Sequence, residues 1–140
     1  MAPRILIDTN VLLDYLLCRS PYEQDARKII VACKSGNAYG CIAAHSVSNI
    51  FFILRKAFSI EERQKLLLDL CELFEIESID KAKIIDALKN EAFSDFEDCL
   101  QMNCAVSYDA DYIVTRNADD FRNSEIPCIE PGAFCEMFLA

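Results

Sequence analysis

The chain has 140 residues, of which 53% are hydrophobic and 26% are charged, and its formal net charge is −9. This composition is typical of a globular domain that buries a core, and it excludes a disordered chain. The acidic balance also excludes a protein that coats nucleic acid non-specifically, because such proteins are basic overall.

Strands and helices are predicted to alternate along the chain. Strands are expected at residues 4–8, 38–43, 76–79, 111–115 and 126–129. The spacing of apolar residues predicts helices at residues 10–19, 22–34, 46–57, 60–73, 81–89, 95–105 and from 131 onward. This alternation predicts an α/β fold with three layers (α/β/α) around a central, mostly parallel sheet of four to five strands.

Several element ends carry local signals. Ser59 and Glu62 have the spacing of a capping box, and Asp80 and Asp95 are candidates to cap the helices that follow them. Pro127 lies in the last strand and places that strand at an edge of the sheet.

The eight cysteines contain no C-x-x-C pair, and most lie in apolar runs. We interpret them as free thiols of a cytoplasmic protein, and with one His a zinc site is not expected. No apolar run approaches the roughly 20 residues of a membrane span, so no membrane partner is expected.

Polar residues follow strands or begin helices at three places. Asp8 ends the first strand, Asp98 lies in the first turn of the helix that begins near residue 95, and Asn117 and Asp120 follow the fourth strand. Each has a simpler explanation as a helix cap or a solvated loop residue, and Glu97 is expected to point away from the others. Together they predict an oxygen-rich site for Mg²⁺ or Mn²⁺, because clustered carboxylates need a cation.

Three stretches carry a joint pattern: residues 7–12 (IDTNVL), 95–101 (DFEDCLQ) and 112–121 (YIVTRNADDF). In this order they resemble the PIN domain family. The resemblance implies one PIN-like domain over residues 1–140 with metal-dependent ribonuclease activity. Such proteins are often the toxin of a bacterial toxin–antitoxin pair.

The resemblance also implies roles for individual residues. Asp8 matches the first metal-binding acid and Asp98 the third, with Asp95 as an accessory acid one turn earlier. Asn117 and Asp120 match the two positions that supply the fourth polar group. The implied ligands of Mg²⁺ or Mn²⁺ are Asp8, Asp98, Asp95 and Asp120.

The second acid of the family pattern is replaced here. Asn49 stands where an acid is usual, in the helix after the second strand. An Asn can bind a metal through its carbonyl oxygen but brings no charge; alternatively, Asn49 closes a capping interaction with Ser46. His45 precedes the same helix and could act as a general base, although a structural role is favoured.

The implied substrate is RNA, whose phosphodiesters the site would hydrolyse. The candidates for substrate binding are Arg116, Arg55, Lys56, Asn10 and Thr115, the last matching a threonine that closes the site. Arg55 and Lys56 equally suit a helix C-terminus, where cations are favourable. The resemblance further implies a homodimer and a possible antitoxin partner.

Three other functions remain open from the sequence. A catalytically weakened PIN fold could bind RNA or protein without cleaving it, and Asn49 favours this possibility. A phosphotransferase of the haloacid dehalogenase type also begins with a strand that ends in Asp, but it needs a second Asp where Asn10 stands. In the third alternative the acids are only helix caps in a structural subunit.

Overall fold

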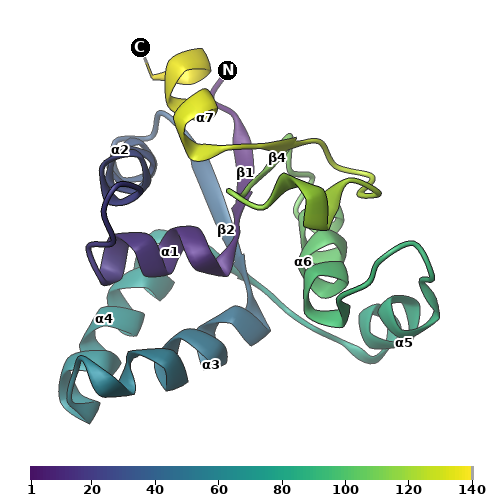
Figure 1. Ribbon diagram of the computed structural model, residues 1–140, viewed down its shortest axis with the longest axis horizontal. Helices are drawn as coiled ribbons and strands as arrows, with labels where there is room; N and C mark the ends of the chain where they lie inside the picture. The colour runs from purple at the N-terminus through teal and green to yellow at the C-terminus, as the bar shows by residue number, and fades with distance from the viewer. Residues whose placement is uncertain (140) are drawn as a thin grey trace.

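The computed structural model describes residues 1–139 and contains one sheet of five parallel strands with helices on both faces (Figure 1). The strands are β1 (Arg4–Ile7), β2 (Tyr39–Ala43), β3 (Glu75–Glu77), β4 (Tyr112–Val114) and β5 (Cys128–Ile129). The helices are α1 (Thr9–Leu16), α2 (Glu23–Lys34), α3 (Ala44–Ile53), α4 (Ile60–Leu73), α5 (Lys81–Lys89), α6 (Phe96–Ser107) and α7 (Pro131–Phe138), with 3₁₀ turns η1 (Leu54–Lys56) and η2 (Ala118–Phe121). The predicted α/β fold with a parallel sheet is confirmed.

Strand β1 lies at the centre of the sheet, in the order β3-β2-β1-β4-β5. Its side chains alternate between the two layers: Ile5 and Ile7 pack in one core cluster and Leu6 in the other. All three are fully buried, because helices cover both faces of a parallel sheet. The edge position predicted for the last strand is confirmed, since β5 pairs only with β4, although the strand begins at Cys128, directly after Pro127.

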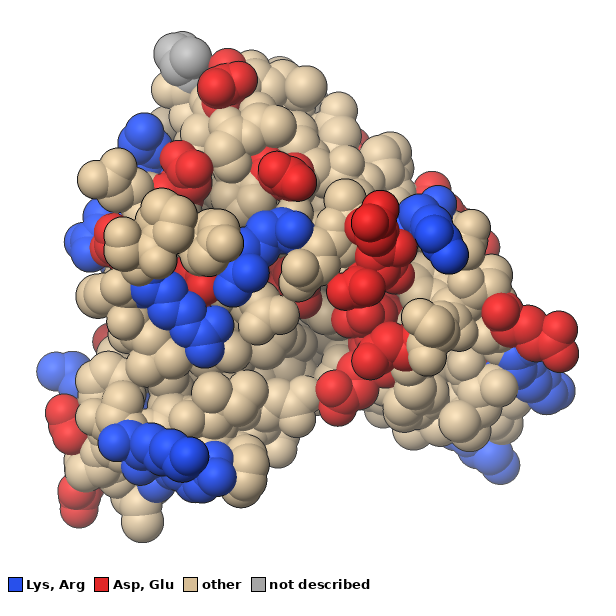
Figure 2. All heavy atoms as spheres, in the orientation of Figure 1, with Lys and Arg blue, Asp and Glu red and all other residues tan. Residues whose placement is uncertain are grey.

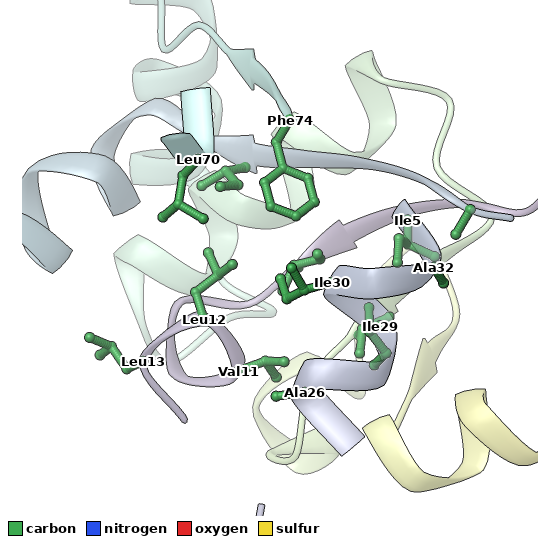
Figure 3. Packing of buried hydrophobic residues seen from close by; sticks show 14 of the residues in the cluster. Ile5, Val11, Leu12, Leu13, Ala26, Ile29, Ile30, Ala32, Leu70 and Phe74 are labelled. Carbon is green, nitrogen blue, oxygen red and sulfur yellow. The ribbon is translucent and has the colours of Figure 1, made fainter. Parts of the chain in front are cut away.

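One helical layer packs on the face that carries Ile5 and Ile7. Buried residues of α1, α2, α3, α4 and α7 contribute to this cluster, and Figure 3 shows side chains of α1 and α2 gathered near Leu70 and Phe74. Gly40 in β2 allows the ring of Phe74 to pack directly against the strand, because a Cβ at position 40 would lie 2.8 Å from two of its ring atoms. Helices α5 and α6 cover the opposite face.

The capping predictions are confirmed, whereas two helix boundaries were wrong. Ser59 and Glu62 form the capping box, and Asp80 and Asp95 accept backbone hydrogen bonds as N-caps. The helix predicted over residues 10–19 ends at Leu16, because Cys18 has a φ of 51° and cannot continue a right-handed helix. The helix predicted over residues 46–57 begins at Ala44 and ends at Ile53, followed by η1.

The prediction of free thiols is confirmed, since all eight cysteines are unpaired.

Within residues 1–139, none of the helices has the length and apolar character needed to cross a lipid bilayer.

The strand order reverses between β1 and β4, because the chain leaves β1 toward β2 and β3 and returns to form β4 and β5 on its other side. Parallel α/β sheets form a crevice at such a point, outside the carboxyl ends of the strands. The residues that follow β1 and β4, and the first turn of α6, meet at this edge.

Candidate active site

Asp8 follows β1 and is only 4% exposed. Gln101 Nε2 in α6 donates a hydrogen bond to Asp8 Oδ1 at 2.9 Å, and Thr115 Oγ1, just after β4, donates one to Asp8 Oδ2 at 2.8 Å. Burial raises the pKa of Asp8, the two hydrogen bonds oppose this shift, and the charge of Asp120 adds to it. The carboxylate is therefore held in a fixed orientation in an environment that disfavours its charge.

Asp98 in α6 is the most perturbed carboxyl group of the site. Its pKa is raised to about 7, first because the group is partly buried and then because Asp95, Asp8, Asp120 and Glu97 carry like charges nearby. Each carboxylate that ionises makes ionisation of the next more costly. The cluster is therefore an electrostatically unfavourable arrangement that a cation would relieve.

A pocket of about 470 Å³ unites these groups. It is lined by Asp8, Thr9, Asn10, Leu13, His45, Asn49, Phe52, Ile53, Asp95, Glu97, Asp98, Gln101 and Asp120. Six of the predicted site residues are in this lining, and none of the lining residues is a Lys or Arg. Figure 2 shows a ridge of acidic side chains along one side of a hollow in the middle of the molecule, with basic side chains on the opposite side.

The remaining predicted residues after β4 lie beside the pocket. The backbone N–H of Asn117 donates to Thr115 Oγ1 at 3.0 Å and so supports the contact that Thr115 makes with Asp8. Arg116 donates from Nε and Nη2 to the two oxygens of Asp14, at 2.7 and 3.1 Å. Asp14 is 1% exposed and forms ion pairs with Arg116 and, at 3.6 Å, with Arg19.

Arg55 and Lys56 lie in η1, next to the pocket wall that α3 forms. Arg55 Nη1 donates to the carbonyl oxygen of Phe52 at 3.0 Å, as expected for a cation at a helix C-terminus. Its guanidinium also lies 3.8 Å from the centre of the Phe52 ring, which is 60% exposed. Lys56 is exposed to solvent.

Asn49 makes a contact that differs from the predicted cap. Its Nδ2 donates to Glu97 Oε1 in α6 at 3.3 Å. The capping alternative was wrong, since α3 has no side-chain cap and the hydroxyl of Ser46 instead accepts a hydrogen bond from Thr9 Oγ1 at 2.8 Å. The expectation that Glu97 points away from the acids was also wrong, since Glu97 lines the same pocket.

His45 is half-buried in the pocket lining. Burial lowers its pKa, with a smaller opposing influence from the charges of Glu97 and Asp95, and its Nδ1 is buried without a hydrogen-bond partner. A neutral imidazole at neutral pH is the expected state.

Gln101 was missed from the sequence although its position carried a signal. It lies three residues after Asp98, within a helix whose neighbouring residues Leu100, Met102 and Cys104 are buried. A long polar side chain in such a stretch needs a buried polar partner, and Asp8 is that partner. Glu97 had no comparable signal, because its contact joins α6 to α3.

The donor chemistry of the pocket fits a hard divalent cation. Its polar lining consists mainly of carboxylate and amide oxygens, the ligands that Mg²⁺ and Mn²⁺ prefer. Gln101 Oε1 is also buried without a hydrogen-bond partner, so one oxygen beside Asp8 is unsatisfied. Over residues 1–139, no three Asp, Glu, His or Cys side chains are arranged so that they could hold a metal ion as they stand.

Solved structures with a similar fold include a toxin–antitoxin complex. The chain is similar to a chain in the crystal structure of VapBC2 from Rickettsia felis bound to a DNA fragment from their promoter (TM-score 0.64, 15% identity, covering 91% of this chain and 98% of that chain). It is also similar to a chain in a toxin–antitoxin complex from Klebsiella pneumoniae (TM-score 0.66, 22% identity, covering 91% of this chain and 97% of that chain). A third similar chain is in the crystal structure of FitAcB from Neisseria gonorrhoeae (TM-score 0.65, 17% identity, covering 91% of this chain and 98% of that chain). At these identities the likeness shows the fold alone.

The family follows from the sequence comparison. No curated protein matched the chain. Residues 4–119 match the PIN domain, and this segment contains strands β1 to β4 and all of the pocket lining except Asp120. The chain therefore belongs to the PIN domain family.

Proposed function

We propose that this protein is a ribonuclease that hydrolyses RNA phosphodiesters with Mg²⁺ or Mn²⁺ and acts as the toxin of a toxin–antitoxin pair. The observation that carries the proposal is the pocket at the carboxyl ends of β1 and β4, where Asp8, Asp95, Asp98 and Asp120 meet without a Lys or Arg in the lining. Membership of the PIN domain family supports the same chemistry.

Asp8 and Asp98 would hold the ion, together with Asp95 or Asp120. When bound, the ion supplies Lewis-acid chemistry: it lowers the pKa of a bound water and stabilises charge that develops at the phosphorus. Thr115 serves this site through the hydrogen bond that it donates to Asp8, because that bond fixes the orientation of the carboxylate and favours its charged form.

Other residues of the chain suit the handling of RNA. Asn10 lines the pocket and offers an amide, whereas Asn117 lies beside it. Asn49 also lines the pocket. Arg55 and Lys56 are exposed beside the wall that α3 forms and can meet phosphates.

Phe52 presents an exposed aromatic ring on that wall. Stacking of a nucleobase on such a ring is worth about 1–3 kcal/mol and tolerates any base. Arg116 is less available than Arg55, because both of its bonds to Asp14 would have to open for it to contact a phosphate.

The proposal is tested with purified protein that has been freed of metal and then supplied with Mn²⁺ or Mg²⁺. We expect cleavage of single-stranded RNA that requires the metal and is lost in Asp8→Asn and in Asp98→Asn. The control Asp69→Asn removes the same charge from an exposed position on α4 and should cleave normally. Identical RNA products from the wild type, both site variants and the metal-free protein would refute the proposal.

A second candidate function is a PIN fold that binds RNA or protein without cleaving it. The observation in its favour is Asn49, which contributes no charge to the pocket. This alternative predicts RNA retention without cleavage at any Mn²⁺ concentration, whereas the ribonuclease proposal predicts both binding and metal-dependent turnover.

Protein partners are proposed from the solved structures of similar fold, which are toxin–antitoxin complexes. We expect an antitoxin and a homodimer. Light scattering of the purified protein tests the dimer, and co-expression with the product of a neighbouring gene tests the antitoxin.

A further inference from the structure

Asn49 faces an acid that comes from another layer of the fold. Its Nδ2 in α3 donates to Glu97 Oε1 in the first turn of α6, at 3.3 Å. Ile50 of α3 packs in one core cluster, whereas α6 packs in the other, so the two helices meet only at the carboxyl edge of the sheet. Both residues line the acidic pocket together with Asp8 and Asp98.

Glu97 adds its charge to the electrostatics of this pocket. The charge of Glu97 is one of the causes that raise the pKa of Asp98, so it acts within the range of the other carboxylates. The lining contains no Lys or Arg that could neutralise it. Glu97 therefore supplies, from α6, a negative charge that Asn49 cannot supply from α3.

An independent feature of the same pocket points to a bound cation. Gln101 is 3% exposed and lines the pocket, and its Nε2 donates a hydrogen bond to Asp8. Its Oε1 is buried without a hydrogen-bond partner. A buried oxygen without a partner is costly, and a cation bound beside Asp8 would satisfy it.

We propose that Glu97 is the second acid of the metal site and that Asn49 is a positioning residue that holds the Glu97 carboxylate. This inference rests on the proposed function. The ligand is a hard divalent cation, Mg²⁺ or Mn²⁺. Asn49 acts through its amide N–H on Glu97, and so its carbonyl oxygen need not bind the ion.

Two variants separate the charge from the contact. Glu97→Gln removes the charge but keeps an oxygen that can accept the hydrogen bond from Asn49. The double variant Asn49→Asp/Glu97→Gln inverts the pair: the carboxylate then lies on α3, the amide lies on α6, and the net charge equals that of the wild type. Glu72→Gln is the matched control, because Glu72 is exposed near the end of α4 and lines a different pocket.

The measurement is the dissociation constant of Mn²⁺, obtained by calorimetry on the metal-free full chain. We expect Glu97→Gln to weaken Mn²⁺ binding about tenfold, as found for groups that orient or complement metal ligands, and the inverted pair to bind within about threefold of the wild type. Glu72→Gln should bind as the wild type does. The rise in Tm on adding Mn²⁺ provides a second readout and should follow the same order.

The outcomes distinguish this inference from the function on which it rests. If the wild type binds Mn²⁺ and Asp8→Asn does not, but Glu97→Gln binds as tightly as the wild type, the role of Glu97 is refuted while the metal site stands. An inverted pair as weak as Glu97→Gln refutes the exchange of roles between positions 49 and 97. If neither the wild type nor any variant binds Mn²⁺, the proposed function fails together with this inference.

Discussion

Replacing Asp98 by Asn removes a carboxylate that Asp95, Asp8, Asp120 and Glu97 repel. The variant should therefore be more stable than the wild type when no metal is present, although the same change removes a proposed metal ligand. The physical reason is that the folded protein partly buries this carboxylate and brings the other charges near it, whereas the unfolded chain exposes and separates them.

The size of the effect follows from the pKa. Raising the pKa of Asp98 from 3.8 to about 7 corresponds to roughly 4 kcal/mol if the carboxylate is fully ionised. The side chain is partly exposed, so solvent screening reduces this figure severalfold. Loss of a negative charge in the first turn of α6 costs roughly 0.3–1 kcal/mol in the opposite direction. The net gain is about 0.5–1 kcal/mol, or a rise in Tm of about 2–4 °C for a chain of this size.

The ionisation of Asp98 determines how the stabilisation by Asp98→Asn changes with pH. The pKa of this carboxyl group is higher in the folded protein than in the unfolded chain, so its ionisation opposes folding. The cost is absent below about pH 4, increases with pH, and is complete above about pH 7. The stabilisation by Asp98→Asn should therefore be larger at pH 8 than at pH 5.5.

The assay is thermal unfolding in chelator at these two pH values, with Asp69→Asn as the matched control. Addition of Mn²⁺ should raise the Tm of the wild type and leave that of Asp98→Asn unchanged. A variant that is no more stable than the wild type at pH 8, or that gains as much at pH 5.5, would show that burial and the neighbouring acids do not disfavour the charge of Asp98 as inferred.

Three further changes test other parts of the structure. Gly40→Ala should destabilise the protein by about 1–3 kcal/mol in urea unfolding, because the new Cβ would lie 2.8 Å from the ring of Phe74; unchanged stability would mean that the ring moves freely. Arg116→Ala should cost about 2 kcal/mol or more and Arg116→Lys should recover only part of it, since a Lys cannot make both hydrogen bonds to the buried Asp14; full recovery with Lys would contradict the bidentate contact. His45, the single histidine, should titrate below 6.5 in a proton NMR experiment, because burial disfavours its charged form, and its protonation should lower stability as the pH falls; a pKa at or above 6.5 would contradict its burial.

Much of the fold could be predicted because its signals are local. Alternating strands and helices with apolar faces permit few arrangements other than a parallel sheet covered on both sides. The caps at Ser59, Asp80 and Asp95 were predicted correctly, since a cap depends on residues within one turn. The end of α1 was not, because nothing in the residues near Cys18 signals its left-handed backbone.

The meeting of Asp8, Asp98 and Asp120 in one pocket was also within reach of the sequence. The carboxyl ends of parallel strands lie at one edge of the sheet, and a helix that returns to start the next strand begins at that same edge. Topology alone therefore brings these residues together, whichever rotamers their side chains adopt.

Only the tertiary structure decided which side chains contact one another across the layers of the fold. Gln101 and Thr115 donate hydrogen bonds to Asp8, from which they are separated by 93 and 107 positions in the sequence. Asn49 donates one to Glu97, which is 48 positions away. Such contacts depend on how helices from opposite layers are placed at the edge of the sheet, to within the length of a hydrogen bond. The sequence thus determined the fold and the acids that it collects, whereas the packing of α3 and α6 against the sheet decided which of those acids face one another.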